Sequence, residues 1–219
     1  MVRDHRVKFR SETEIAGYAQ QVRSYLGCCD SLPIDIIAVV RFLEGKPFPK
    51  KGRLFLKLFD KEGVEPDAKI TFEPLTMHIE HELWEYARLG DPFSRFVLAH
   101  EVGHAVLHDK DAKAFSRQES GFDIFGFDET SAEWQANVFA GHLLAPDALA
   151  RQSYDAAHLA REANIEFKRA NSQLNSLNSR KLWRKTDFFG EACRKCASFT
   201  LLRFGLKLTC ITCRDVSEI

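Results

Sequence analysis

The segment from Asp91 to His108 places the strongest constraint on how this chain can fold. Asp91-Pro92 is typical of a helix start, because aspartate accepts backbone N–H groups at the N-cap and proline at the first helical position loses no hydrogen bond. In the helix that follows, His100 and His104 lie one turn apart on the same face. The opposite face carries Leu98, Val102, Ala105 and Val106. The sequence therefore predicts a helix that packs by one side and presents two imidazoles on the other.

Two imidazoles at this spacing can bind one tetrahedral zinc ion. Glu101, between them, is rotated about 100° from His100, so it points beside the metal instead of at it. There its carboxylate can accept a proton from a water molecule that the metal activates. Helical histidines also occur in purely structural hydrogen bonds, which is the alternative interpretation. Gly103 is unfavourable in a helix, and we expect another backbone to approach closely there.

His100 and His104 leave coordination positions of the zinc ion to fill. His108 cannot supply a ligand for one of them. It continues the row of histidines, but it lies about 12 Å along the helix axis from His100, too far for one ion. The pattern HExxHxxGxxH, which supplies a third histidine after a glycine turn, is absent, because Leu107 occupies the glycine position. We therefore expect the third ligand to come from another element.

The segment from Glu133 to Ala140 is the best source of that ligand. Glu133 and Asn137 lie one turn apart on one helical face. Glu133 can coordinate zinc, while the amide oxygen of Asn137 accepts a hydrogen bond from the second nitrogen of a ligand histidine. In the alternative, Thr130 to Glu133 form a capping box, in which Glu133 bonds back to the N-cap amide.

Four cysteines near the end of the sequence predict a second zinc site. Cys193 and Cys196 form one CxxC pair, Cys210 and Cys213 form another, and 13 residues separate the pairs. Two such pairs complete a closed Cys₄ shell, which is structural. The apolar residues between them, around Gly205, predict a hairpin and hence a zinc ribbon. A redox role for one CxxC would leave the other pair unexplained.

The remaining pattern predicts an α+β fold. Helices are expected over residues 12–26, 33–44, 91–108, 130–145, 147–161 and 164–185, strands over 53–59, 69–72 and 75–83, and a loop over 109–128. Alternation in the third strand predicts a half-buried antiparallel sheet, with an exposed edge near residues 76–82 that could take a peptide by strand addition. We expect one domain over residues 1–190 and the ribbon over residues 191–219.

Charge and composition exclude some classes of protein. The net charge is zero, so nothing draws the whole chain toward nucleic acid or anionic membranes. Residues 180–215 hold nine Lys or Arg against three Asp or Glu. This excess can bind nucleic acid or an acidic partner, or it can offset the negative Cys₄ zinc centre. No run of 18 apolar residues and no signal peptide is present, so we expect a cytoplasmic protein without a membrane span.

The two central segments resemble the ImmA/IrrE family of metallopeptidases. Residues 96–108 are similar to the family's "RFTLAHELGHxLLH" helix, and residues 133–146 to its "ExEANxFAxxLLxP" helix, with Gln135 in place of the second Glu. The resemblance covers about residues 12–180 and implies a zincin-like fold. It implies His100, His104 and Glu133 as metal ligands and Glu101 as the base. The zinc ribbon lies outside the usual extent of the family.

By this resemblance, the chain is a bacterial or phage zinc endopeptidase that cuts a helix-turn-helix repressor and so derepresses stress-response or mobile-element genes. We expect two Zn²⁺ ions, one catalytic and one structural. The alternative is a binding module, in which zinc only braces a fold that sequesters a transcription factor or binds nucleic acid. Glu101 favours the enzyme, because a purely structural site needs no carboxylate at that position.

Overall fold

The computed structural model describes residues 7–63, 66–110, 128–181, 194–196, 201–204, 207–210, 213 and 215–218. The chain divides into two compact units, Met1–Gln173 and Leu174–Ile219. Most of the predicted loop over 109–128, Cys193 and the predicted boundary between residues 190 and 191 lie outside the described residues. No helix in the described part of the chain is both long and apolar enough to cross a membrane.

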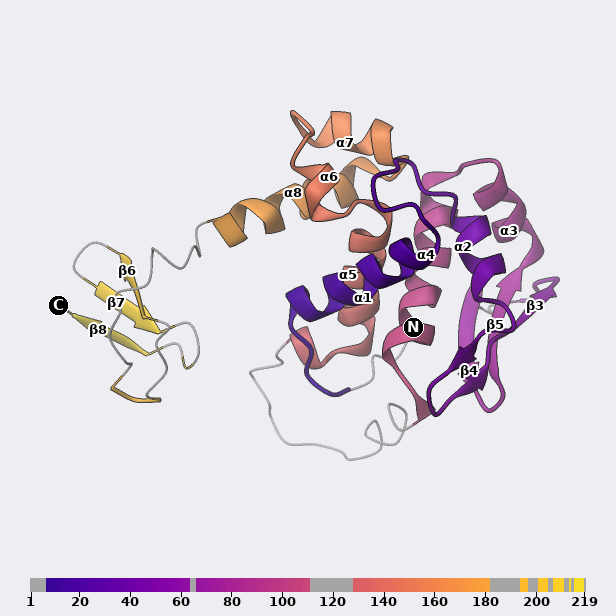
Figure 1. The fold of residues 1–219 in the computed structure, drawn as a ribbon, viewed down its shortest axis with the longest axis horizontal. Helices are drawn as coiled ribbons and strands as arrows, with labels where there is room; N and C mark the ends of the chain where they lie inside the picture. The colour runs from indigo at the N-terminus through magenta and orange to yellow at the C-terminus, as the bar shows by residue number, and fades with distance from the viewer. Residues whose placement is uncertain are drawn as a thin grey trace. The chain divides into compact units, whose positions relative to one another are not determined.

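The first unit combines helices with two small sheets (Figure 1). Its helices are α1 (Glu12–Tyr25), α2 (Ile36–Leu43), α3 (His81–Arg88), α4 (Pro92–Leu107), α5 (Ala132–Leu144), α6 (Asp147–Ala150) and α7 (Ala156–Ala163), with the 3₁₀ turn η2 (Asp128–Thr130) before α5. The helix α8 (Phe167–Lys181) begins in this unit and continues past its boundary at Gln173. The strands are β1 (Pro47–Phe48), β2 (Gly52–Arg53), β3 (Phe55–Phe59), β4 (Ala68–Phe72) and β5 (Leu75–Glu80). The α+β prediction is therefore confirmed.

The three-stranded sheet has the order β3-β5-β4 and is mixed. β4 pairs with β5 antiparallel, whereas β3 pairs with β5 parallel. The prediction of an antiparallel sheet is thus wrong for one of the two pairings. After β3 the chain passes the carboxyl end of β5 before it enters β4, and the β4–β5 hairpin then places β5 in the centre. The exposed edge predicted at residues 76–82 is wrong for the same reason, because β5 has neighbours on both sides.

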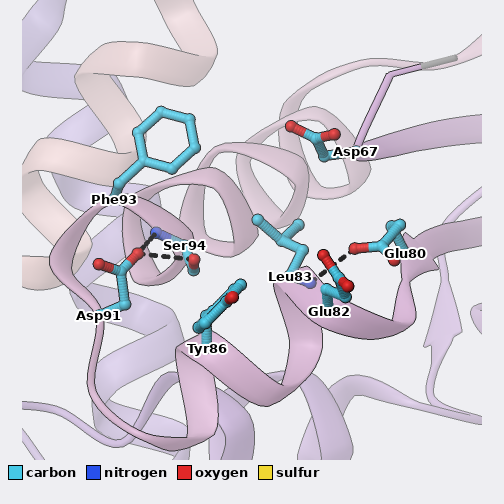
Figure 2. A pocket seen from close by; sticks show the side chains of 8 residues that line it. All are labelled: Asp67, Glu80, Glu82, Leu83, Tyr86, Asp91, Phe93 and Ser94. Atoms are coloured by element: carbon cyan, nitrogen blue, oxygen red, sulfur yellow. Dashed lines mark hydrogen bonds between the residues drawn. The ribbon is translucent and has the colours of Figure 1, made fainter. Parts of the chain in front are cut away.

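β5 is shorter than the predicted strand, because a helix that the sequence analysis missed begins at His81. The Glu80 carboxylate accepts the N–H of Leu83 at 2.7 Å and so caps α3 (Figure 2). After the end of α3, Asp91 caps α4 by accepting hydrogen bonds from both the N–H and the hydroxyl of Ser94. The start of α4 at Asp91-Pro92 is as predicted.

The core lies around α4, which packs between the sheet and α5 (Figure 1). Met77 and Ile79 of β5 are fully buried on the inner side of the sheet. On the other side of α4, the apolar residues of α5 are fully buried as well: Ala136, Phe139, Ala140, Leu143 and Leu144. α1 covers α5 in turn. The two helices that carry the predicted metal ligands therefore form the centre of the unit.

Other helix boundaries differ from the sequence prediction. The second helix begins at Ile36 and not at Pro33, because the Asp35 carboxylate caps it. The helix predicted over residues 147–161 is two short helices, α6 and α7, and Asp155 caps the second of them. Local capping carboxylates decide each of these boundaries.

The second unit contains a three-stranded antiparallel sheet of β6 (Leu201–Phe204), β7 (Lys207–Cys210) and β8 (Val216–Glu218). β6 and β7 pair antiparallel, with Leu201 opposite Cys210. The two strands of the predicted hairpin are therefore paired, and Gly205 itself lies outside the described residues.

Candidate metal centres

The first candidate centre lies where α4 and α5 come closest. A Cβ added to Gly103 would lie 3.1 Å from the Cα and the carbonyl oxygen of Ala136 and from the ring of Phe139. Glycine at this position therefore allows the close backbone approach that the sequence predicted. The approach brings the histidine face of α4 against the first turns of α5.

Three side chains from these two helices converge on one point. The Nε2 atoms of His100 and His104 are 2.9 Å apart. The Glu133 carboxylate oxygens lie 3.2 Å from Nε2 of His100 and 3.4 Å from Nε2 of His104. All three side chains are partly exposed. Among the described residues, this trio is one of two clusters with the composition and spacing to hold a metal ion.

The capping box, which was the alternative role for Glu133, does not form. Ser131, not Thr130, is the N-cap of α5, and its hydroxyl accepts the N–H of Trp134 at 2.9 Å. Glu133 therefore has no cap amide to serve, and its carboxylate turns toward the two histidines. Their hydrogen bonds, first from His100 and then from His104, hold the pKa of the Glu133 carboxyl well below its ordinary value. The carboxylate is thus charged near neutral pH.

Behind His104 lies a chain of hydrogen bonds that runs to the backbone. The amide nitrogen of Gln135 donates to the carbonyls of Lys8 and Glu129 at 2.8 and 2.7 Å, so its oxygen faces His108 Nε2 at 3.2 Å and accepts from it. Burial is the main cause that lowers the pKa of His108 to about 3, so this ring is neutral. Nδ1 of His108 is then an acceptor, 3.0 Å from Nδ1 of His104.

The contact with His108 decides the tautomer of His104. Its Nδ1 carries a hydrogen and donates to His108, which leaves Nε2 to face His100 and Glu133. His100 is oriented in the same way from the other side, because its Nδ1 lies 3.2 Å from the amide oxygen of Asn137 and donates to it. Both Nε2 atoms therefore point inward, each ready to hold either a proton or a metal ion. The contact predicted for Asn137 is present.

Glu101 lies beside this cluster in a buried position, 7% exposed. Burial raises the pKa of its carboxyl above the ordinary value, although the nearby His104 and His100 act in the opposite direction. Such a carboxyl exchanges protons closer to neutral pH than a solvated glutamate does.

Two cations hold the end of α4 that follows His104. Lys51 donates to the carbonyls of Ala105 and Val106 at 2.7 and 3.0 Å, and Arg10 donates to the carbonyl of Leu107 at 2.9 Å. Burial is the main cause that lowers the pKa of Lys51 to about 8. The last carbonyls of a helix have no N–H partner within the helix, and the two side chains supply donors for them. Their positive charges also stabilise the negative end of the helix dipole. Sequence reasoning missed both residues, because they lie 54 or more positions from their partners.

The second candidate centre is a cysteine cluster in the second unit. Ligand atoms of Cys196, Cys210 and Cys213 lie within 4.8 Å of one another, and the sulfurs of Cys196 and Cys210 are 3.6 Å apart. Cys210 is fully buried, and Cys213 packs against it and Leu208. The fourth predicted ligand, Cys193, lies outside the described residues.

Comparison with known proteins gives a family for the first unit. Residues 69–174, which include α4 and α5, match the family model of the IrrE N-terminal-like domain of peptidase family M78. No curated protein matches the chain significantly. One similar solved structure is titled "Mycobacterium tuberculosis transcriptional regulator"; it has a TM-score of 0.47 and 16% sequence identity, over 72% of this chain and 45% of that one. The chain thus spans less than half the length of that structure.

Proposed function

We propose that this chain, whose residues 69–174 match the IrrE N-terminal-like domain of peptidase family M78, is a zinc-dependent endopeptidase. Its substrate is a regulatory protein in the cytoplasm, namely a helix-turn-helix repressor. One observation carries the proposal: His100, His104 and Glu133 turn three ligand atoms toward one point, and separate partners orient both imidazoles.

The donor set fits zinc. In a tetrahedral site with bonds of about 2.0–2.1 Å, neighbouring ligand atoms lie about 3.3 Å apart. The distances among the two Nε2 atoms and the carboxylate are 2.9, 3.2 and 3.4 Å. Two nitrogens and one carboxylate oxygen are also the set that catalytic zinc sites use, with one position left open. His100, His104 and Glu133 would therefore hold the ion.

Bound zinc supplies Lewis acidity, which polarises a carbonyl and lowers the pKa of water. The chain's own residues then handle the proton. Glu101 accepts a proton at its carboxylate from the attacking water and passes it to the leaving amine, for which its raised pKa is suited. Asn137 and the His108–Gln135 pair hold the two imidazoles in position while this happens.

For the second unit, we propose a structural zinc bound by Cys193, Cys196, Cys210 and Cys213. A tetrahedral shell with Zn–S bonds of about 2.3 Å separates sulfurs by about 3.8 Å. The 3.6 Å between Cys196 and Cys210 is close to this value. Closed thiolate shells leave no open position, so this ion would brace the hairpin and take no part in cleavage.

A pair of isosteric variants tests the proposal. Glu101→Gln removes the proton acceptor but leaves the proposed ligands, so it should keep both zinc ions while cleavage of the repressor falls by roughly 10²–10⁴-fold. Glu133→Gln replaces a carboxylate ligand by a poor neutral one, so it should lose one zinc and all cleavage. Elemental analysis and a cleavage assay with the purified repressor measure both effects. Normal cleavage by Glu101→Gln would reject Glu101 as the base. Binding of the repressor by the wild type without any cleavage would reject the peptidase and favour a binding module.

A further inference from the structure

The outer face of the three-stranded sheet carries a row of basic side chains that the peptidase function does not use. Lys57 of β3 lies opposite His78 of β5, and His78 lies opposite Lys69 of β4. Residues opposite each other on neighbouring strands share a face and lie close together. Because Met77 and Ile79 are buried on the inner face, this row lies on the face turned away from α4.

Neither Lys57 nor Lys69 forms an ion pair with a carboxylate among the described residues. Two nearby acids pair with other groups: Asp60 with His81 at 2.7 Å, and Asp67 with Lys61 at 2.5 Å. Glu62 lies near the row without an ion pair to either lysine. Burial, followed by the charges of Lys69 and Lys57, lowers the pKa of His78 below its ordinary value. Lys57 and Lys69 thus flank His78 from both neighbouring strands, and they place two positive charges on this face of the sheet.

The row borders a hollow of about 350 Å³. Its lining consists of Lys57, Phe59, Asp60, Glu62, Lys69 and His78. This volume is in the range of small-molecule sites, which combine a few polar groups with an apolar wall. Phe59 supplies such a wall, and Phe55 follows on the same face of β3, 53% exposed. The hollow thus offers two ammonium groups beside an aromatic ring.

We propose that this hollow binds a small phosphorylated ligand with a flat ring, of the nucleoside monophosphate class. Lys57 and Lys69 contact the phosphate, and the ring of the ligand packs on Phe59. Nε2 of His78 lies 3.2 Å from the hydroxyl of Thr71, so the imidazole donates to the phosphate from Nδ1. Asp60 and Glu62 also line the hollow, and their carboxylates disfavour a nucleic-acid strand, which would bring several phosphates to this surface. The site is separate from the metal centres and goes beyond the proposed peptidase function.

Calorimetric titration of the full-length protein tests this site with three probes: adenosine monophosphate, inorganic phosphate and a short single-stranded oligonucleotide. The wild-type protein should bind the nucleotide saturably and inorganic phosphate more weakly. Lys57→Gln with Lys69→Gln should weaken nucleotide binding at least tenfold. A control with two other lysines changed, Lys46→Gln with Lys168→Gln, should bind as the wild type does. Phe59→Leu should weaken nucleotide binding but leave phosphate binding unchanged.

Thermal unfolding without ligand gives a second readout. Lys69→Gln should leave the Tm of the ligand-free protein nearly unchanged, because the residue opposite Lys69 is His78, whose pKa is lowered, and not another lysine. Saturating nucleotide should raise the Tm of the wild type but not that of the double variant. The proposal is overturned if neither nucleotide nor phosphate binds saturably, or if the double variant binds the nucleotide as well as the wild type. Tighter binding of the oligonucleotide than of the mononucleotide would overturn the assignment to a small ligand.

Discussion

Replacing His108 by phenylalanine should weaken the proposed catalytic zinc site without touching a ligand. His108 is 4% exposed and joins His104 to Gln135. Phenylalanine fills a similar volume but leaves the His104 Nδ1–H and the Gln135 amide oxygen without their partner. A buried polar group left unpaired costs about 1–3 kcal/mol, so the free energy of unfolding should fall by about 2–5 kcal/mol.

The effect on zinc is the more specific readout. Without His108, the His104 ring can rotate or change tautomer, and the loss of such an orienting partner costs roughly 10–100-fold in metal affinity. Competition with a chelator measures this affinity, after the chelator-resistant zinc has been counted by elemental analysis. His81→Phe is the control, because His81 is exposed and pairs only with Asp60 at the surface.

A conservative variant separates orientation from folding. His108→Asn keeps an acceptor near His104 Nδ1, so it should lose less zinc affinity than His108→Phe does, although both lose the contact with Gln135. The reasoning is refuted if His108→Phe folds and binds zinc as tightly as His81→Phe.

Two further predictions concern the support of α4. Gly103→Ala should lower the free energy of unfolding by about 1–3 kcal/mol in denaturant titrations, because the added Cβ meets the Ala136 backbone at 3.1 Å. Gly17→Ala in α1, which has nothing within 4 Å, should raise it by about 0.5–1 kcal/mol, and equal effects would contradict the close approach. Lys51 binds its proton more weakly when folded, so stability should rise by at most about 3 kcal/mol as the pH increases from about 8 to 10.5. Lys51→Met should lack this rise, and an identical pH profile in both proteins would contradict the buried amine.

Local patterns in the sequence predicted the central helices because capping and periodicity act over a few residues. Asp91-Pro92 marks the start of α4, and Gly103 indicates a close neighbour. The contact of Asn137 with His100 also followed from helical spacing.

Strand pairing could not be predicted in this way. Alternation identifies the buried face of β5, but it says nothing about whether a neighbouring strand runs parallel or antiparallel. Leu83 happens to continue the alternation of β5, which hid the start of α3, although the Glu80 carboxylate caps that helix. Lys51 supports the end of α4 through a hydrogen bond to a carbonyl 54 residues further along the chain. A local sequence pattern cannot predict such a contact.

The most direct test of the metal centre is a crystal structure of the zinc-loaded protein with anomalous diffraction at the zinc edge. The account predicts a peak within about 2.0–2.2 Å of Nε2 of His100, Nε2 of His104 and one carboxylate oxygen of Glu133. His108 should remain outside this shell and keep its contact with Gln135. A zinc ion bound by His108 in place of Glu133, or no peak between α4 and α5 at full zinc loading, would contradict the account.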